Sequence, residues 1–118
     1  MKTLKFISLI VLISIVTLSI SSCKKCNGED PSARIINNGT KKASVQIKTS
    51  GGNTININNV DPSTSSPYVR YAVGTTTFTI TVSNVNYSRI VEMSQCYDYD
   101  ISIDASNYIF VNPIDRNN

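Results

Sequence analysis

Cysteine and aspartate are the residue types best suited to chemistry in this chain, because the sequence contains no histidine. Without histidine the chain lacks the usual general base, the commonest metal ligand and the ordinary Ser-His-Asp and Cys-His arrangements. Cys26 and Cys96 are too few for a zinc site, and no residue can be named that would activate Cys96 as a nucleophile. Nor does the sequence contain a phosphate-binding glycine loop or a dinucleotide fingerprint. We therefore predict that the protein is not an enzyme and uses no cofactor.

Three aspartates near the C-terminus are the weak candidate for a metal site. Asp98, Asp100 and Asp104 share one parity of a strand, opposite an apolar row, so they are expected on one exposed face. Calcium prefers oxygen ligands, but residues two apart on a strand lie nearly 7 Å from each other, which is wide for one ion. We therefore favour a solvated acidic face that protects a sheet edge and assign no metal, with calcium as the weaker alternative.

Three tyrosines are candidates for binding. Tyr68, Tyr71 and Tyr87 are expected in or beside loops, where exposed rings could stack on sugars or anchor a protein partner. The ordinary alternative is that these side chains fill sheet positions with their hydroxyl groups at the rim. We favour that alternative, because the chain has no tryptophan and the spacing forms no obvious platform.

The N-terminus follows the plan of an export signal. Lys2 and Lys5 precede an apolar stretch at residues 6–20, and the small residues Ser21 and Ser22 follow it. The apolar stretch is shorter than the roughly 20 residues that a membrane-spanning helix needs. A cleaved leader is therefore favoured over a retained anchor helix.

The end of this leader resembles the lipobox of bacterial lipoproteins, through Ile20-Ser21-Ser22-Cys23. The resemblance implies that Cys23 is diacylated, becomes the first residue and fixes the protein to a membrane. It also implies outer-membrane sorting, because Lys24 is not the aspartate of inner-membrane retention; the direction in which the protein faces stays open. The remainder is similar in general texture to small Bacteroidota envelope lipoproteins of unassigned function. The alternative is an ordinary secretory peptide that leaves Cys23 as a thiol.

If Cys23 is consumed by lipid, Cys26 and Cys96 remain as a pair in an oxidising compartment. A disulfide between them would hold the domain close to the bilayer, because Cys26 lies three residues after Cys23. Two free thiols, or an intermolecular bridge, are the alternative.

The length after the leader suits one domain. We expect a signal peptide at 1–22, a lipidated N-terminus and linker at 23–32, and the folded domain at 33–118. The chain has 11 basic and 8 acidic side chains, and the leader carries two of the lysines. The mature part is therefore close to neutral and has no basic stripe, which argues against nucleic acid as a partner.

Residues 33–118 alternate with period two, as half-buried strands do. Phe78, Ile80 and Val82 alternate with threonines, and residues 97–104 alternate as strictly. About eight strands are expected, at 34–36, 44–48, 55–57, 68–73, 76–82, 89–93, 97–104 and 108–111. Asn38-Gly39 predicts a type I′ hairpin, glycines at 51, 52 and 74 and residues 105–107 predict further turns, and residues 61–67 suit a crossing between two sheets. The pattern favours an all-β, immunoglobulin-like or related Greek-key sandwich.

These observations leave a lipid-anchored, non-catalytic module that contacts another envelope or surface protein as the leading interpretation. A carbohydrate-binding accessory domain of an outer-membrane system is the second. A purely structural or stress-related envelope protein is the third.

Overall fold

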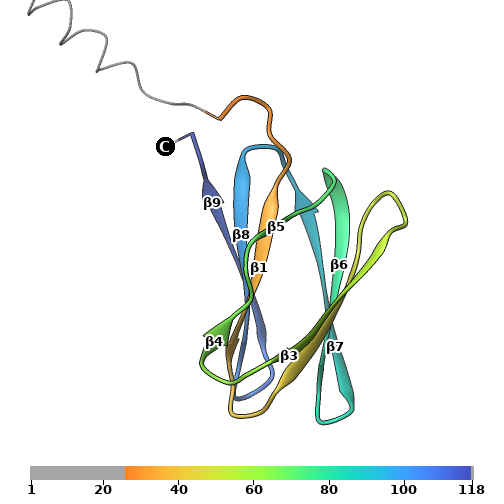
Figure 1. The fold of residues 1–118 in the computed structure, drawn as a ribbon, viewed down its shortest axis with the longest axis vertical. Helices are drawn as coiled ribbons and strands as arrows, with labels where there is room; N and C mark the ends of the chain where they lie inside the picture. The colour runs from red at the N-terminus through yellow and green to blue at the C-terminus, as the bar shows by residue number, and fades with distance from the viewer. Residues whose placement is uncertain (1–25, 118) are drawn as a thin grey trace, which may run out of the picture.

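Nine strands make up the fold of residues 26–117, which are the residues that the computed structural model describes (Figure 1). The strands are β1 (Ser32–Asn38), β2 (Ala43–Lys48), β3 (Thr54–Val60), β4 (Thr64–Ser65), β5 (Val69–Arg70), β6 (Gly74–Val82), β7 (Val85–Met93), β8 (Tyr97–Asp104) and β9 (Ile109–Asp115). This part of the chain contains no helix, and so none that could cross a membrane. The all-β prediction is confirmed.

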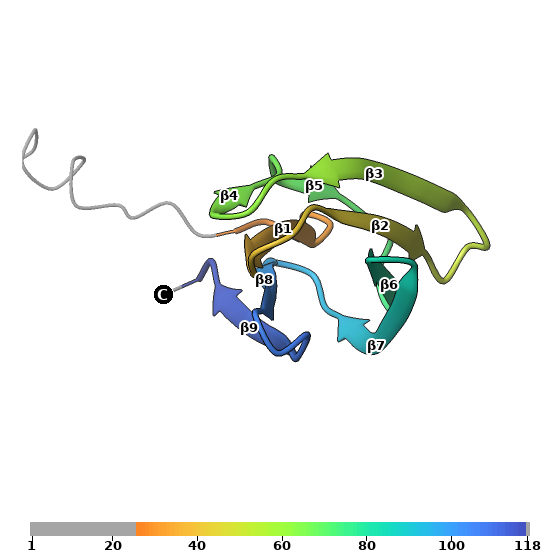
Figure 2. The same cartoon turned by 90° about the horizontal axis from the view of Figure 1, so that it is seen from below.

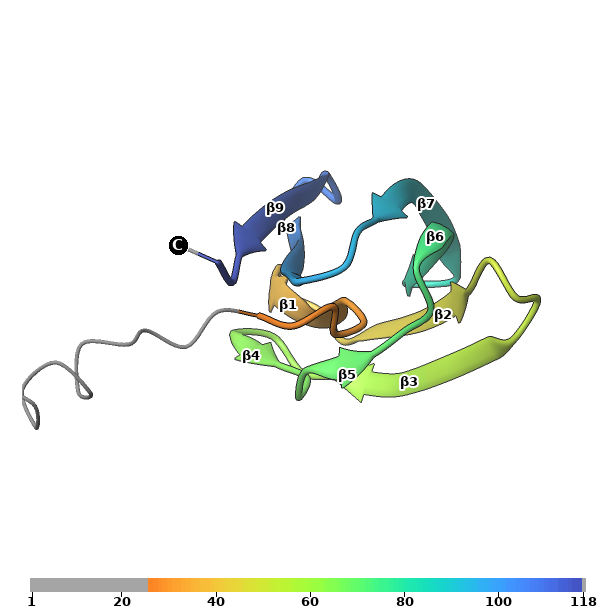
Figure 3. The same ribbon diagram turned by 90° about the horizontal axis from the view of Figure 1, so that it is seen from above.

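The strands form two sheets that pack face to face. One sheet has the order β4-β1-β8-β9, with β5 also paired to β1, and the other has the order β3-β2-β6-β7. Strands β1 and β8 run parallel, whereas the other pairs are antiparallel. Figures 2 and 3 look along the strands and show β8 and β9 opposite β6 and β7. The architecture is a single-domain β-sandwich, as the sequence predicted.

The core lies between the sheets and is built by the predicted alternation. In β6, Phe78, Ile80 and Val82 are buried, whereas the threonines between them are only partly covered. Ile101 and Ile103 of β8 are fully buried and complete the core from the other sheet. Removing these apolar side chains from water is the main force that holds the sheets together.

The predicted hairpin at Asn38-Gly39 is wrong. Strand β1 precedes this dipeptide and β2 follows it, but they belong to different sheets and do not pair. Neither Asn38 nor Gly39 has the positive φ that a type I′ turn requires. Instead, buried Asn37 shapes the bend: its Nδ2 donates to the carbonyls of Lys41 (2.8 Å) and Val60 (2.9 Å). Its Oδ1 accepts from the amide of Gly39 at 2.9 Å.

Two adjacent positive-φ residues turn a hairpin that the sequence did not reveal. Ser83 (φ 51°) and Asn84 (φ 63°) form the two-residue loop between β6 and β7. Two such residues fit the type I′ geometry. The turn was missed because neither residue is glycine. Turns do occur near Gly52 (φ 85°) and Asn107 (φ 62°), where they were expected.

Residues 61–67 cross from one sheet to the other, as predicted. They leave β3, contribute β4 to the edge of β1, and lead to β5 on the same edge. The strand expected at residues 68–73 is reduced to Val69–Arg70. Tyr71, just beyond it, is buried instead of lying in an exposed loop.

Candidate functional site

A disulfide between Cys26 and Cys96 links the start of the described chain to the loop before β8. Their Cα atoms lie 5.6 Å apart, and the two residues are separated by 70 positions. The intramolecular bridge that the sequence left as one of several outcomes is therefore the one in the structure. It lies at the end of the sandwich where residues 26–32, 94–96 and 115–117 meet, which we call the N-terminal pole (Figure 1).

Backbone hydrogen bonds reinforce the bridge at this pole. The amide of Cys96 donates to the carbonyl of Glu29 at 3.0 Å, and the amide of Tyr71 donates to the carbonyl of Pro31 at 2.9 Å. At the C-terminal side, the amide of Arg116 donates to the carbonyl of Cys96 at 2.9 Å. Residues 26–31 are thus tied to the strands by main-chain contacts at several points.

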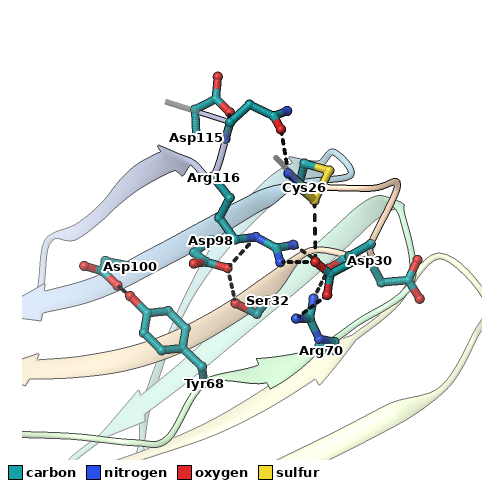
Figure 4. A network of polar contacts seen from close by, with 12 residues as sticks. Cys26, Asp30, Ser32, Tyr68, Arg70, Asp98, Asp100, Asp115 and Arg116 are labelled. Carbon is teal, nitrogen blue, oxygen red and sulfur yellow. Dashed lines mark hydrogen bonds and ion pairs between the residues drawn. A yellow bond between two sulfur atoms is a disulfide. The ribbon is translucent and has the colours of Figure 1, made fainter. Parts of the chain in front are cut away.

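Two arginines from distant parts of the chain converge on the same short segment (Figure 4). Arg70 and Arg116 donate to the carbonyl of Asp30, at 2.7 and 2.9 Å. They also flank the carboxylate of Glu29, at 3.0 and 3.5 Å. The segment predicted as a linker up to residue 32 is therefore part of the folded domain from Cys26 onward, because its polar backbone is satisfied by β5 and by the C-terminal residues.

The acidic row of β8 is partly arranged as predicted, but its carboxylates have protein partners. Asp98 accepts a hydrogen bond of 2.6 Å from Ser32 and lies 3.2 Å from Arg116 Nε. Asp104 lies at the far end of β8, where it accepts from the amides of Ser106 and Tyr108 in the turn. The structure thus places Asp104 away from the other two, at the opposite end of the strand.

Asp100 has the most complete set of partners. Arg34 Nε and Nη2 donate to its two oxygens at 2.8 and 3.2 Å, and the Tyr68 hydroxyl donates at 2.5 Å. These bonds hold the pKa of Asp100 below its usual value, with the Arg34 hydrogen bond as the largest cause. Burial, and then the hydrogen bond to Asp100, raise the pKa of Tyr68. Among residues 26–117, no group of three or more acidic or cysteine side chains could hold a metal ion.

The three candidate tyrosines have three different environments. Tyr68 is 42% exposed, but its hydroxyl is bonded to Asp100 and its ring lies 4.8 Å below the Arg34 guanidinium. Tyr71 is only 4% exposed, which removes it from any binding surface. Tyr87 of β7 is half-buried, and its hydroxyl accepts a bond of 3.1 Å from Asn107 Nδ2. Tyr87 also borders a hollow.

Two adjoining hollows lie towards the end of the sandwich opposite the disulfide. The smaller one is bordered by the loops at 39–42, 83–84 and 105–107, and the larger one by residues 86–89 of β7 and residues 107–109. Figure 1 shows these loops at the end opposite the N-terminal pole. We call the two hollows together the distal hollow. Their volumes are about 190 and 400 Å³, and both are bordered by Tyr87 and Asn107. Lys41 borders the smaller one, and Arg89 and Tyr108 border the larger one. Sequence reasoning missed these two cations and Asn107, because segments far apart in the chain bring them together.

Comparison of the chain with protein-family models finds no match, and neither does comparison with curated proteins.

Proposed function

We propose that this chain is a non-catalytic, lipid-anchored protein of the outer membrane that presents a small β-sandwich to another envelope or surface protein. The observation that carries the proposal is the fastening of the N-terminal pole by the Cys26–Cys96 disulfide and by Arg70 and Arg116. Cys23, the proposed lipid-bearing residue, lies outside the described residues.

Because Cys23 lies close to Cys26 in the chain, a lipid on Cys23 would also orient the domain relative to the membrane. Cys26 lies three positions after Cys23, so their Cα atoms can be at most about 11 Å apart. A lipidated Cys23 would therefore keep the N-terminal pole next to the bilayer. Strand β8 has eight residues and leads away from that pole, over roughly 26 Å. The distal hollow would then face away from the membrane.

A surface suited to a protein partner lies along β9, which pairs with β8 alone among the described strands. Tyr108 and Phe110 are 57% and 51% exposed, and their ring centroids lie 4.7 Å apart. Ile114 is also exposed on this strand. An edge strand with exposed aromatic rings offers both backbone hydrogen bonds and apolar anchors to a partner chain.

The anchor is tested by replacing Cys23 with alanine in the natural host. We expect the variant to lose the mass of the acyl chains and to leave the membrane pellet, or to accumulate with its leader uncleaved. Cys26→Ser is the matched control, because it removes a neighbouring cysteine, and with it the disulfide to Cys96, but leaves the lipid site intact. A C23A product with the mass and membrane fractionation of the parent protein would overturn the proposed anchor.

The partner is tested by placing a photo-cross-linking amino acid at Phe110 in intact envelopes. Ile90, exposed on β7 of the other sheet, is the matched control position. We expect one discrete protein adduct from position 110 and none from position 90. The same adduct pattern from both positions, or no adduct from either, would contradict a protein partner at β9.

A carbohydrate-binding accessory domain is the second candidate function. The distal hollow favours it, because Tyr87, Tyr108 and the amide of Asn107 gather there. Aromatic faces and amides are groups that suit sugar rings and their hydroxyls.

A further inference from the structure

The charge of the distal hollow differs from that of the N-terminal pole. Lys41 and Arg89 border it, and no carboxylate is among the described residues that line it. Neither cation forms an ion pair within residues 26–117, whereas Arg34, Arg70 and Arg116 all do. Each of the two adjoining hollows is therefore bordered by one cation without a counter-ion among the described residues, which favours a ligand with anionic groups.

Tyr87 forms one side of the distal hollow, and a hydrogen bond holds its side chain in place. Its hydroxyl oxygen accepts from Asn107 Nδ2, so the ring is fixed between β7 and the turn before β9. Because that hydroxyl acts as the acceptor, its own proton remains available for an acceptor on a ligand. Tyr108 adds a second ring, which is supported by its contact with Phe110.

The hydrogen-bonding groups around the two rings are neutral amides and hydroxyls. Asn86 and Ser88 border the larger part, and Ser83 borders the smaller one. At about 400 Å³ the larger part falls within the range of small-molecule sites. Aromatic walls, neutral polar groups and unpaired cations together match a sugar ring that carries an acidic group.

We infer that the distal hollow binds an acidic oligosaccharide, with Arg89 contacting an acidic group in the larger part, Lys41 contacting another in the smaller part, and Tyr87 or Tyr108 packing on a ring. This inference rests on the second candidate function and gives it a ligand class. Arginine is suited to this role because its guanidinium can donate two parallel hydrogen bonds to a carboxylate. Neutral sugars would lack this interaction and should bind more weakly.

The test is calorimetric titration of the purified full chain with tri-galacturonate and with its methyl ester. The two probes share ring and linkage, and only the free acid carries charge. We expect the acid to bind and the ester to bind about tenfold or more weakly, since a charge-assisted hydrogen bond contributes at least that factor. Binding of the acid should also weaken at high salt.

Arg89→Gln and Lys41→Gln should each weaken binding of the acid by about tenfold. Lys48→Gln is the matched control, because Lys48 is an exposed lysine of β2 that does not border the distal hollow. Thermal melting of each variant checks the fold. Lys41 and Arg89 are exposed, so the melting midpoints of the two variants should match that of the parent protein.

Three outcomes would overturn the inference. They are equal binding of acid and ester, equal losses from K48Q and R89Q, or no heat from either probe at millimolar concentration. None of them bears on the proposed anchor or on the β9 partner, because the mass of the C23A variant and the adduct at position 110 are measured separately.

Discussion

Arg34 and Asp100 occupy paired positions on the parallel strands β1 and β8 and form a bidentate ion pair with distances of 2.8 and 3.2 Å. Tyr68, which directly follows the crossing segment, covers the pair and donates to the same carboxylate. These contacts join β1, β8 and the connection that leads into β5. The carboxylate of Asp100, which could have been a metal ligand in the acidic row, is therefore occupied by protein partners and connects these segments.

Asp100→Asn should destabilise the domain by about 1–2 kcal/mol at neutral pH, because it removes the charge from a bidentate, partly buried pair. The pKa of Asp100 is lower in the folded protein than its usual value of 3.8. Its contribution is therefore fully present above that value and is lost as the pH falls through the lower folded pKa.

Urea unfolding at several pH values checks this prediction. The difference between wild type and D100N should be constant near neutrality and shrink below about pH 3.8. Asp61→Asn is the control, because its contact with Lys42 is 3.8 Å long and well exposed, so little change is expected. A D100N effect that is the same at every pH would contradict the role of the charge.

Cys96→Ser should lower the free energy of unfolding by up to about 4 kcal/mol, the chain-entropy figure for a loop closed across 70 positions. Cys26→Ser and the double variant should give the same loss, because either change removes the whole bridge. Thermal melting measures the loss. Alkylation of the unreduced protein should modify neither Cys26 nor Cys96, and labelling of both would refute the bridge.

Asn37→Ala should cost about 2–4 kcal/mol, because it leaves the buried carbonyl of Val60 and the partly buried carbonyl of Lys41 without their donor and the Gly39 amide without its acceptor. Asn37→Asp should be no better, since a carboxylate would then face the carbonyls of Lys41 and Val60. The control Asn38→Ala changes an exposed neighbour and should stay within about 0.5 kcal/mol. Chemical denaturation distinguishes the three; an N37A variant as stable as N38A would exclude this role for Asn37.

Tyr71→Phe should leave stability unchanged or raise it by about 1 kcal/mol. The Tyr71 hydroxyl is buried without a hydrogen-bond partner among the described residues, and burial raises its pKa. Tyr99→Phe is the matched control, because the buried Tyr99 hydroxyl accepts from the amide of Ser94 at 2.9 Å. That variant should lose about 1 kcal/mol. Equal losses in urea midpoints from both variants would show that the Tyr71 hydroxyl has a partner.

The alternation of residue types determined the strands, because a half-buried strand needs apolar side chains at every second position. Strand β8 at residues 97–104 coincides with its predicted range, and β6 contains the predicted 76–82. The crossing at residues 61–67 was also predicted correctly, from its prolines and serines. Asn38-Gly39 failed as a hairpin signal because the turn type depends on whether the flanking strands pair, and β1 and β2 do not.

Sequence alone also singled out Cys26, Cys96, Tyr87 and the acidic row, but it could not say which of them meet. The tertiary structure decided that Arg34 and Arg116 neutralise Asp100 and Asp98, and that Tyr71 lies in the core. It alone placed Lys41 and Arg89 beside two adjoining hollows that share Asn107. The physical reason is that periodicity records only which side of its own strand a residue occupies. The sheet order and the loops decide which distant residue it faces.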